Sequence, residues 1–139
     1  MKTFYPLFVV LFLISIGNGQ KLHEVIETYK NGNIKSIHYH EKTGNRMFLV
    51  KIEMYHNFPT FQVLDYETVF KNGKRGDKVI TKWHLNGQKE YEETYKDHKQ
   101  DGLYTSWYDN GQKKYEMIYK NGKINKVIGK WNEDGSVKE

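Results

Sequence analysis

Residues 107–123 read WYDNGQKKYEMIYKNGK, and residues 83–99, which begin 24 positions earlier, read WHLNGQKEYEETYKDHK. When residues 83–106 are laid over residues 107–130 without a gap, 10 of the 24 positions are identical, and Trp131 then opens a third, truncated copy. A fixed period of this length indicates a repeat architecture, in which each unit is one supersecondary element that needs its neighbours to bury its apolar side.

Side chains alternate between two sides within each unit. Val79, Thr81 and Trp83 fall on one side of one segment, and Tyr91 and Tyr95 share a side of the next. This period of two is typical of β-strands and not of helices. Each unit is then expected to hold two strands of about eight residues joined by tight turns, so equivalent side chains recur two strands apart, at about 9 to 10 Å.

Asn-Gly pairs separate the strand-like segments. They occur at Asn31-Gly32, Asn72-Gly73, Asn86-Gly87, Asn110-Gly111 and Asn121-Gly122. Asn and Gly tolerate positive φ better than other residues, and type I′ hairpin turns require it at both central positions. The sequence therefore predicts a hairpin tip at each pair.

The amino-terminal half follows the same pattern less regularly. Strands are predicted over four segments, residues 22–29, 34–40, 47–55 and 61–70. Residues 20–139 make a chain of about 120 residues, which suits one domain and is too short for two. We expect an all-β fold of antiparallel hairpins, with residues 20–139 as a single repeat domain, degenerate over 20–65 and clear over 66–139.

The first 19 residues have the composition of a secretory signal peptide. Lys2 gives a positive start, residues 4–16 are almost entirely apolar, and Gly17-Asn18-Gly19 places small residues before the expected cleavage point. We therefore expect removal of residues 1–19 and export to the periplasm, the cell surface or the medium. An uncleaved membrane anchor is the alternative, but the apolar run is short for a spanning helix.

The composition restricts the partner class. Removal of Lys2 lowers the formal net charge from +5 to +4, and Lys alternates with Glu in the repeats instead of forming a basic stripe. Nucleic acid is therefore not the expected partner. Cysteine and alanine are absent, and aromatic residues make up 15% of the chain. This balance favours strands, and stability must come from sheet pairing and packing rather than from disulfides.

The repeat pattern, a Trp-Tyr-x-Asn-Gly-Gln-Lys start, a Tyr-Glu-x-x-Tyr-Lys middle and an Asn-Gly-Lys end, resembles the MORN-repeat variant (membrane occupation and recognition nexus). The resemblance is closest over residues 83–131, extends more loosely over 66–82 and is weak over 22–55. It implies an elongated, twisted antiparallel β-meander with a scaffold or binding role. In bacteria the family includes many chains regarded as antitoxins of toxin–antitoxin systems. The export signal and the insertion between Tyr55 and Phe70 depart from that pattern.

Two constellations could carry chemistry. His38 and His40 lie two apart on a predicted strand and could share a metal ion if His23 or His56 supplied a further ligand. A polar, solvent-facing strand explains the same spacing, and we favour that interpretation. Accordingly, we predict no metal site and no cofactor.

The carboxylates offer no catalytic pair. Glu90 and Glu92 alternate with Lys and recur with the repeat, as expected for cross-strand ion pairs. Glycosidase chemistry needs two carboxylates across a cleft, and no nucleophile elbow or phosphate-binding loop is present. We expect a protein that is not an enzyme.

The aromatic residues of the repeat are the candidate binding residues. They are Trp83, Tyr91, Tyr95, Trp107, Tyr115, Tyr119 and Trp131. Regular rows of such side chains can stack on sugars, on bases or on a partner's side chains. In a thinly covered sheet the same rows replace a conventional core. If one face carries function, we expect Trp83, Trp107, Tyr91 and Tyr115 at the centre of one patch.

Three functions follow from these features. The leading hypothesis is an exported, non-catalytic repeat module that binds another protein through an extended sheet face. A toxin-neutralising antitoxin is the alternative implied by the resemblance. A lipid-surface or glycan-binding module is the third, and the basic residues Lys120, Lys123, Lys126 and Lys130 are the feature that favours anionic lipid.

Overall fold

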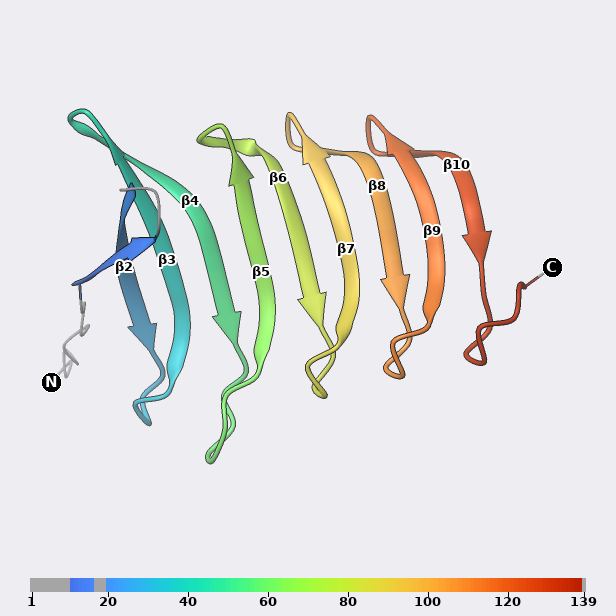
Figure 1. The fold of residues 1–139 in the computed structure, drawn as a ribbon, viewed down its shortest axis with the longest axis horizontal. Helices are drawn as coiled ribbons and strands as arrows, with labels where there is room; N and C mark the ends of the chain where they lie inside the picture. The colour runs from blue at the N-terminus through green and yellow to red at the C-terminus, as the bar shows by residue number, and fades with distance from the viewer. Residues whose placement is uncertain (1–10, 17–19, 139) are drawn as a thin grey trace, which may run out of the picture.

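The fold is one open antiparallel sheet. The computed structural model describes residues 11–16 and 20–138, and this part of the chain contains ten strands and no helix. The strands are hydrogen-bonded in chain order from β1 to β10, and Figure 1 shows β2 to β10 side by side in that order. The prediction of an all-β antiparallel meander of hairpins is therefore confirmed.

The strands alternate in direction and are short. They are β1 (Leu11–Ile16), β2 (Gln20–Thr28), β3 (Ile34–Thr43), β4 (Arg46–Tyr55), β5 (Leu64–Lys71), β6 (Lys74–Trp83), β7 (Lys89–Lys96), β8 (Lys99–Trp107), β9 (Lys113–Lys120) and β10 (Lys123–Lys130). β7 and β9 begin and end 24 residues apart. The repeat unit is thus two strands with their connections, as the sequence predicts.

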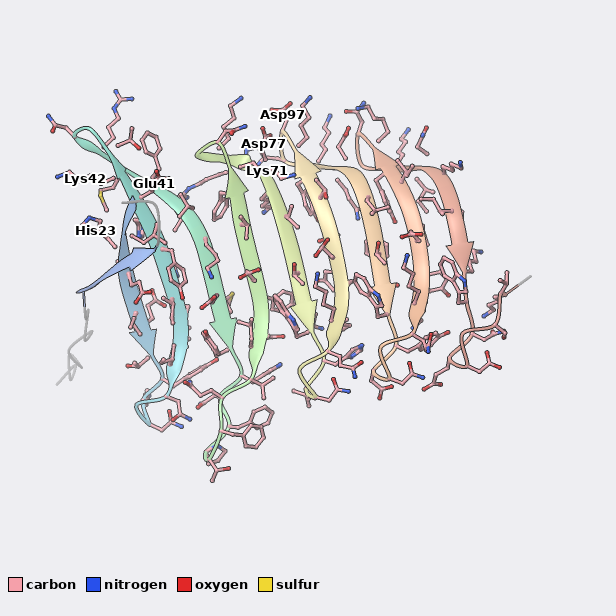
Figure 2. All side chains as sticks on the ribbon, viewed as in Figure 1. His23, Glu41, Lys42, Lys71, Asp77 and Asp97 are labelled. Carbon is pink, nitrogen blue, oxygen red and sulfur yellow. The ribbon has the colours of Figure 1, made fainter. Side chains whose placement is uncertain are left out.

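One row of connections consists of two-residue turns, which we call the turn row. Asn72 and Asn121 have positive φ, as do the glycines that follow them, which is the type I′ geometry expected there. Asp97 and His98 also have positive φ, at 47° and 65°, and form a third turn of this kind without any glycine. The Asp77 carboxylate stabilises this turn by accepting a hydrogen bond of 2.9 Å from the Asp97 backbone N–H (Figure 2).

The opposite row, which we call the loop row, consists of three-residue loops apart from the longer connection between β4 and β5. At Asn86-Gly87 only the glycine has positive φ, and the same holds at Asn31-Gly32 and Asn110-Gly111. The Gly87 N–H bonds the His84 carbonyl, and the His84 N–H bonds the Gln88 carbonyl. This is a type I turn followed by a left-handed glycine. The three pairs are hairpin tips as predicted, but their turns are not type I′, because the loop is one residue longer.

The sheet has no conventional core. Among the described residues no hydrophobic side chain is fully buried, and the fully buried polar residues are Glu24, Ser36, Thr81, Thr105 and Ser106. The described strands all belong to this one sheet, so within the described residues no second layer covers either face. The larger side chains are half-buried against their neighbours within the same face. Cross-strand contacts and the two rows of connections therefore hold the fold together.

The predicted signal peptide falls mainly outside the described residues. Residues 1–10 and 17–19 belong to this undescribed part, whereas Leu11–Ile16 pairs with β2 as strand β1. The prediction of cleavage after residue 19 stays a prediction. No helix able to cross a membrane occurs in the part of the chain that the structure describes.

Candidate binding surfaces

The aromatic residues of the repeat lie on two opposite faces. Lys82 is paired with Tyr91, and the next residue of β6, Trp83, is paired with Lys89, which leaves Glu90 as an extra residue in β7. Paired residues share a face, and successive residues of β6 point to opposite faces. We call the side with Trp83 the tryptophan face and the side with Tyr91 the tyrosine face.

The same arrangement recurs one repeat later. Ser106 is paired with Tyr115, Trp107 is paired with Lys113, and Lys114 is the extra residue of β9. A single inserted residue transfers all the side chains before it to the other face. By register, Trp83 and Trp107 therefore lie on the opposite face from Tyr91 and Tyr115, although Trp107 also lines a hollow beside these two tyrosines.

The tryptophan face carries an apolar row that runs from β5 to β9 and is interrupted by Thr94 in β7. Val69 is paired with Val79, and Leu103 is paired with Ile118. Leu103 is 46% exposed and Val69 is 39% exposed, so the row lies open to solvent. A partner could bury it without any rearrangement of the sheet.

Lysine and tryptophan side chains border this row. The Lys89 Nζ lies 5.7 Å from the Trp107 ring centroid, and the Lys113 Nζ lies 5.8 Å from that of Trp131. Both ammonium groups also pair with a glutamate three residues on, at 2.6 and 2.7 Å. The predicted aromatic ladder is therefore a row in which lysine separates successive tryptophans. Cation–π contacts of this kind stabilise an exposed site by about 0.5–1 kcal/mol.

At its amino-terminal end the tryptophan face carries a polar cluster around Glu53. Tyr39 and Tyr55 each donate a hydrogen bond of 2.8 Å to Glu53 Oε2, and Lys51 donates one of 2.6 Å to Oε1. Burial would raise the pKa of Glu53, but the bonds from Lys51, Tyr39 and Tyr55 outweigh it and lower the pKa. Burial and the bond to Glu53 raise the pKa of both tyrosines above its ordinary value. Glu53 is therefore ionised, and its carboxylate holds the side chains of Tyr39, Lys51 and Tyr55 together.

A groove of about 570 Å³ lies beside this cluster, at the turn-row end of β2 to β5. Phe48, Val50 and Val69 supply much of its apolar wall, and Lys51 and Glu41 supply charge. Because Val69 belongs to both, the groove continues the apolar row. Together they form one surface that spans several strands.

The tyrosine face carries a second aromatic cluster. The Tyr104 ring centroid lies 6.2 Å from that of Tyr91 and 6.0 Å from that of Tyr119. Beside them, Glu93 accepts hydrogen bonds from the Tyr95 hydroxyl at 3.1 Å and from Gln100 Nε2 at 3.0 Å. Burial raises the pKa of Glu93 in spite of the Tyr95 bond. Tyr91 and Tyr119 are therefore linked through Tyr104, which sequence reasoning missed.

A small hollow interrupts the tyrosine face at the loop-row end of β7 to β9. Its volume is about 180 Å³, and its lining residues are His84, Glu90, Tyr91, Tyr104, Ser106, Trp107, Lys114 and Tyr115. The Ser106 hydroxyl is buried there and forms no hydrogen bond with any described residue. Burial raises the pKa of the neighbouring Tyr104. This hydroxyl therefore has hydrogen-bonding capacity that the described side chains leave unused.

Ser106 is the exception within its own row. Lysine stands at the equivalent positions one repeat earlier and one repeat later, Lys82 and Lys130. Lys82 forms an ion pair of 3.0 Å with Glu90, whereas the residue equivalent to Glu90 in the next repeat is Lys114. The second repeat thus has Ser106 and Lys114 where the first has an ion pair. Comparison of the repeats was the signal that could have found this site.

Of the predicted candidates, Tyr91 and Tyr115 flank the hollow, and Tyr95 is held by Glu93. Trp131 lies over Gly129, so closely that a Cβ at position 129 would overlap its ring. Trp131 is therefore part of the sheet's packing.

The histidines are distributed along the amino-terminal strands. His23 is paired with His40, and the His38 Nε2 lies 3.2 Å from the Ser36 hydroxyl. Within residues 11–16 and 20–138 there is no group of three or more metal-ligating side chains that could hold a metal ion.

The basic residues near the carboxy-terminus are not one patch. Lys120 pairs with Asp101 at 3.1 Å. Lys126 is opposite Ile118, which lies on the tryptophan face, whereas Lys130 is opposite Tyr115 on the tyrosine face. Their charge is therefore divided between the two sides of the sheet, which weakens the case for an anionic lipid surface.

Comparison with protein-family models, with curated proteins and with solved structures finds no match. The resemblance to MORN-repeat variants therefore rests on the motif alone. Evidence for a function therefore comes from the side chains on the two faces of the sheet.

Proposed function

We propose that the protein is an exported, non-catalytic module that binds another protein through the tryptophan face. The observation that carries this proposal is the open apolar row on a sheet in which no described hydrophobic side chain is buried. Sheets of soluble domains normally bury at least one face against another layer. A partner protein would provide that layer.

The chemistry of the face suits a protein partner. Its centre is aliphatic at Val69, Val79 and Leu103, and its border carries Trp107 together with Lys-Glu pairs. Protein interfaces combine an apolar, aromatic centre with a polar rim in the same way. Because the motif recurs with the repeat, contacts accumulate along the sheet. A neutralised toxin is one partner of this kind, as the resemblance to MORN-repeat variants implies.

Two matched variants test the proposal. Leu103 on the tryptophan face and Val127 on the tyrosine face are 46% and 45% exposed, and both lie in strands. We expect Leu103→Asp to abolish capture of the protein's partner from the cells that produce it, because the charge interrupts the apolar row. Val127→Asp should leave capture unchanged.

The outcome is read by affinity capture after cross-linking, with circular dichroism to show that both variants fold. Retention of the partner by folded Leu103→Asp would contradict the proposal. Equal loss in both variants would also contradict it, because the contact would then not be confined to one face. Size-exclusion chromatography with light scattering identifies the case in which the partner is a second copy.

Export is tested separately. We expect the mature chain, isolated from outside the cytoplasm, to begin at Gln20. Intact-mass analysis and amino-terminal sequencing measure this directly. A chain that retains residues 1–19 in the cytoplasm would contradict export but leave the binding proposal to its own test.

A further inference from the structure

We propose that the hollow between Tyr91 and Tyr115 is a binding subsite for one neutral sugar residue of a glycan. It lies on the tyrosine face, so it is separate from the surface assigned to a protein partner. The hollow holds about 180 Å³, the volume of roughly six water molecules. That space suits a single ring, not a drug-sized ligand.

The walls and floor match a sugar ring. Tyr91 and Tyr115 are both paired with Ser106, one from each neighbouring strand, so their positions lie about 9 to 10 Å apart. Two aromatic rings at that separation leave room for a flat apolar ring face to pack against one of them. At the floor, the buried Ser106 hydroxyl has no hydrogen bond with any described residue. A ligand hydroxyl would satisfy it.

The charges select a group that both donates and accepts hydrogen bonds. Glu90 is on one side, held by Lys82 at 3.0 Å, and it can accept bonds from vicinal hydroxyls. Lys114 is on the other side, with its ammonium 5.2 Å from the Tyr108 ring centroid and 5.9 Å from that of Tyr115. None of the described carboxylates forms an ion pair with Lys114, so its ammonium can donate to the ligand.

This arrangement disfavours charged side chains of a peptide. A carboxylate would approach Lys114 but meet Glu90, and a cation would approach Glu90 but meet Lys114. A hydroxyl group donates to one and accepts from the other, so a neutral sugar satisfies both at once. The His84 ring adds a polar wall of fixed orientation, because its Nε2 bonds the Trp107 carbonyl at 3.1 Å.

The preceding repeat supplies the variant for the test. There the equivalent positions are Lys82 and Glu90, which form an ion pair. The double substitution Ser106→Lys with Lys114→Glu copies that pair into the second repeat. It should fill the hollow, satisfy the buried position and preserve the fold.

The purified protein is titrated with neutral oligosaccharides of hexoses and of N-acetylhexosamines, followed by calorimetry and saturation-transfer NMR. Oligouronates, and acidic and basic peptides of similar size, are titrated in parallel. We expect saturable binding of at least one neutral oligosaccharide, and affinity at least about tenfold weaker in the double variant. Glu90→Gln and Lys114→Gln should each weaken binding severalfold, and Leu103→Asp, on the opposite face, should not change it.

Absence of binding to every neutral oligosaccharide would overturn the inference. Undiminished binding by the folded double variant would overturn it as well, as would binding of the charged ligands alone. If the double variant does not fold, the two glutamine variants decide, and unchanged affinity in both overturns it. Loss of protein capture in Leu103→Asp is a different result, so the two proposals fail independently.

Discussion

Asn110 donates a hydrogen bond of 2.8 Å from its side-chain Nδ2 to the backbone carbonyl of Glu133 in the following loop. One repeat earlier, Asn86 donates to the Asp109 carbonyl at 2.5 Å in the same way. Each asparagine also accepts a bond from the backbone N–H two residues on. The asparagine of the repeat therefore stabilises its own loop and attaches it to the next one.

These two roles can be separated at Asn110. Asn110→Asp keeps the acceptor for the Gln112 N–H, 2.9 Å away, but removes the donor to Glu133. We expect it to lower the free energy of unfolding by about 1 kcal/mol, and Asn110→Ala to lower it by about 2 kcal/mol because both bonds are lost. Urea unfolding followed by circular dichroism measures both. In the last loop, Asp134 already stands at the equivalent position, and Asp134→Asn should change little. Equal stability of Asn110→Asp and the wild-type protein would show that the bond between loops contributes nothing.

A second contact between loops involves glycine. Gly111 has φ of +83°, and a Cβ there would lie 2.5 Å from Gln88 Oε1, whereas Gly122 has φ of +81° with open space around it. Both Ala substitutions place alanine in the left-handed region, at a cost of about 1–2 kcal/mol. We expect Gly111→Ala to cost more than Gly122→Ala by thermal unfolding. Adding Gln88→Ala to Gly111→Ala should remove the difference. Equal costs for the two single variants would mean that the Gln88 side chain moves away freely.

Glu53 and Glu93 should give stability opposite dependences on pH. The pKa of Glu53 is lowered in the folded state, so its contribution is present above the unfolded value and is lost as the pH falls through the folded one. Burial raises the pKa of Glu93, so its contribution is present at low pH and is lost as the pH rises through the folded value.

The prediction is tested by urea unfolding between about pH 3 and pH 7, a range that brackets the ordinary Glu value. Relative to the wild-type protein, Glu53→Gln should be least stable near pH 7, by about 1 kcal/mol or more, with the deficit shrinking in acid. Glu93→Gln should gain relative stability as the pH rises. Parallel pH profiles for the two variants would contradict the assignment of these carboxyl groups.

Gly129 and Trp131 provide a test of the structural role of the tryptophan row. Because a Cβ at position 129 would overlap the Trp131 ring, we expect Gly129→Ala to displace the indole into solvent. Tryptophan fluorescence should shift to longer wavelength, and stability should fall by about 1–3 kcal/mol. Thr105 lies 24 residues before Gly129 and is its equivalent in the preceding repeat. Because Thr105 already carries a Cβ, Thr105→Ala adds no atom beside an indole and should leave the emission maximum in place. An unchanged spectrum in folded Gly129→Ala would show that Trp131 is already exposed.

The hairpins and the repeat were predictable because turn chemistry and a period of two are local properties of the chain. The turn at Asp97-His98 contains no glycine, and only its 24-residue offset from Asn121-Gly122 marks it. Asn86-Gly87 and Asn121-Gly122 are the same dipeptide, but only Asn121 has positive φ. The turn type is therefore decided by the length of the loop and not by the pair itself.

The assignment of side chains to faces could not be read from the sequence. Alternation counted from Trp83 through the loop fails at Glu90, where one extra residue reverses the side of everything before it. Whether a strand contains such a bulge depends on pairing with the neighbouring strand. The hollow at Ser106 was not predicted, because a serine without a flanking glycine pattern carries no catalytic signal. Its significance comes from its burial and from the lysines at equivalent positions.

The order of the strands has a consequence for biogenesis. Each strand of the sheet is hydrogen-bonded only to the strands that precede and follow it in the chain. Contacts between neighbours in sequence close small loops, which favours rapid folding. Such a chain can fold hairpin by hairpin as it emerges, from a ribosome or from a translocation channel, because no strand has to wait for a partner that arrives much later. For a protein without cysteines, assembly in order of arrival would keep short the time during which its strand edges are unpaired.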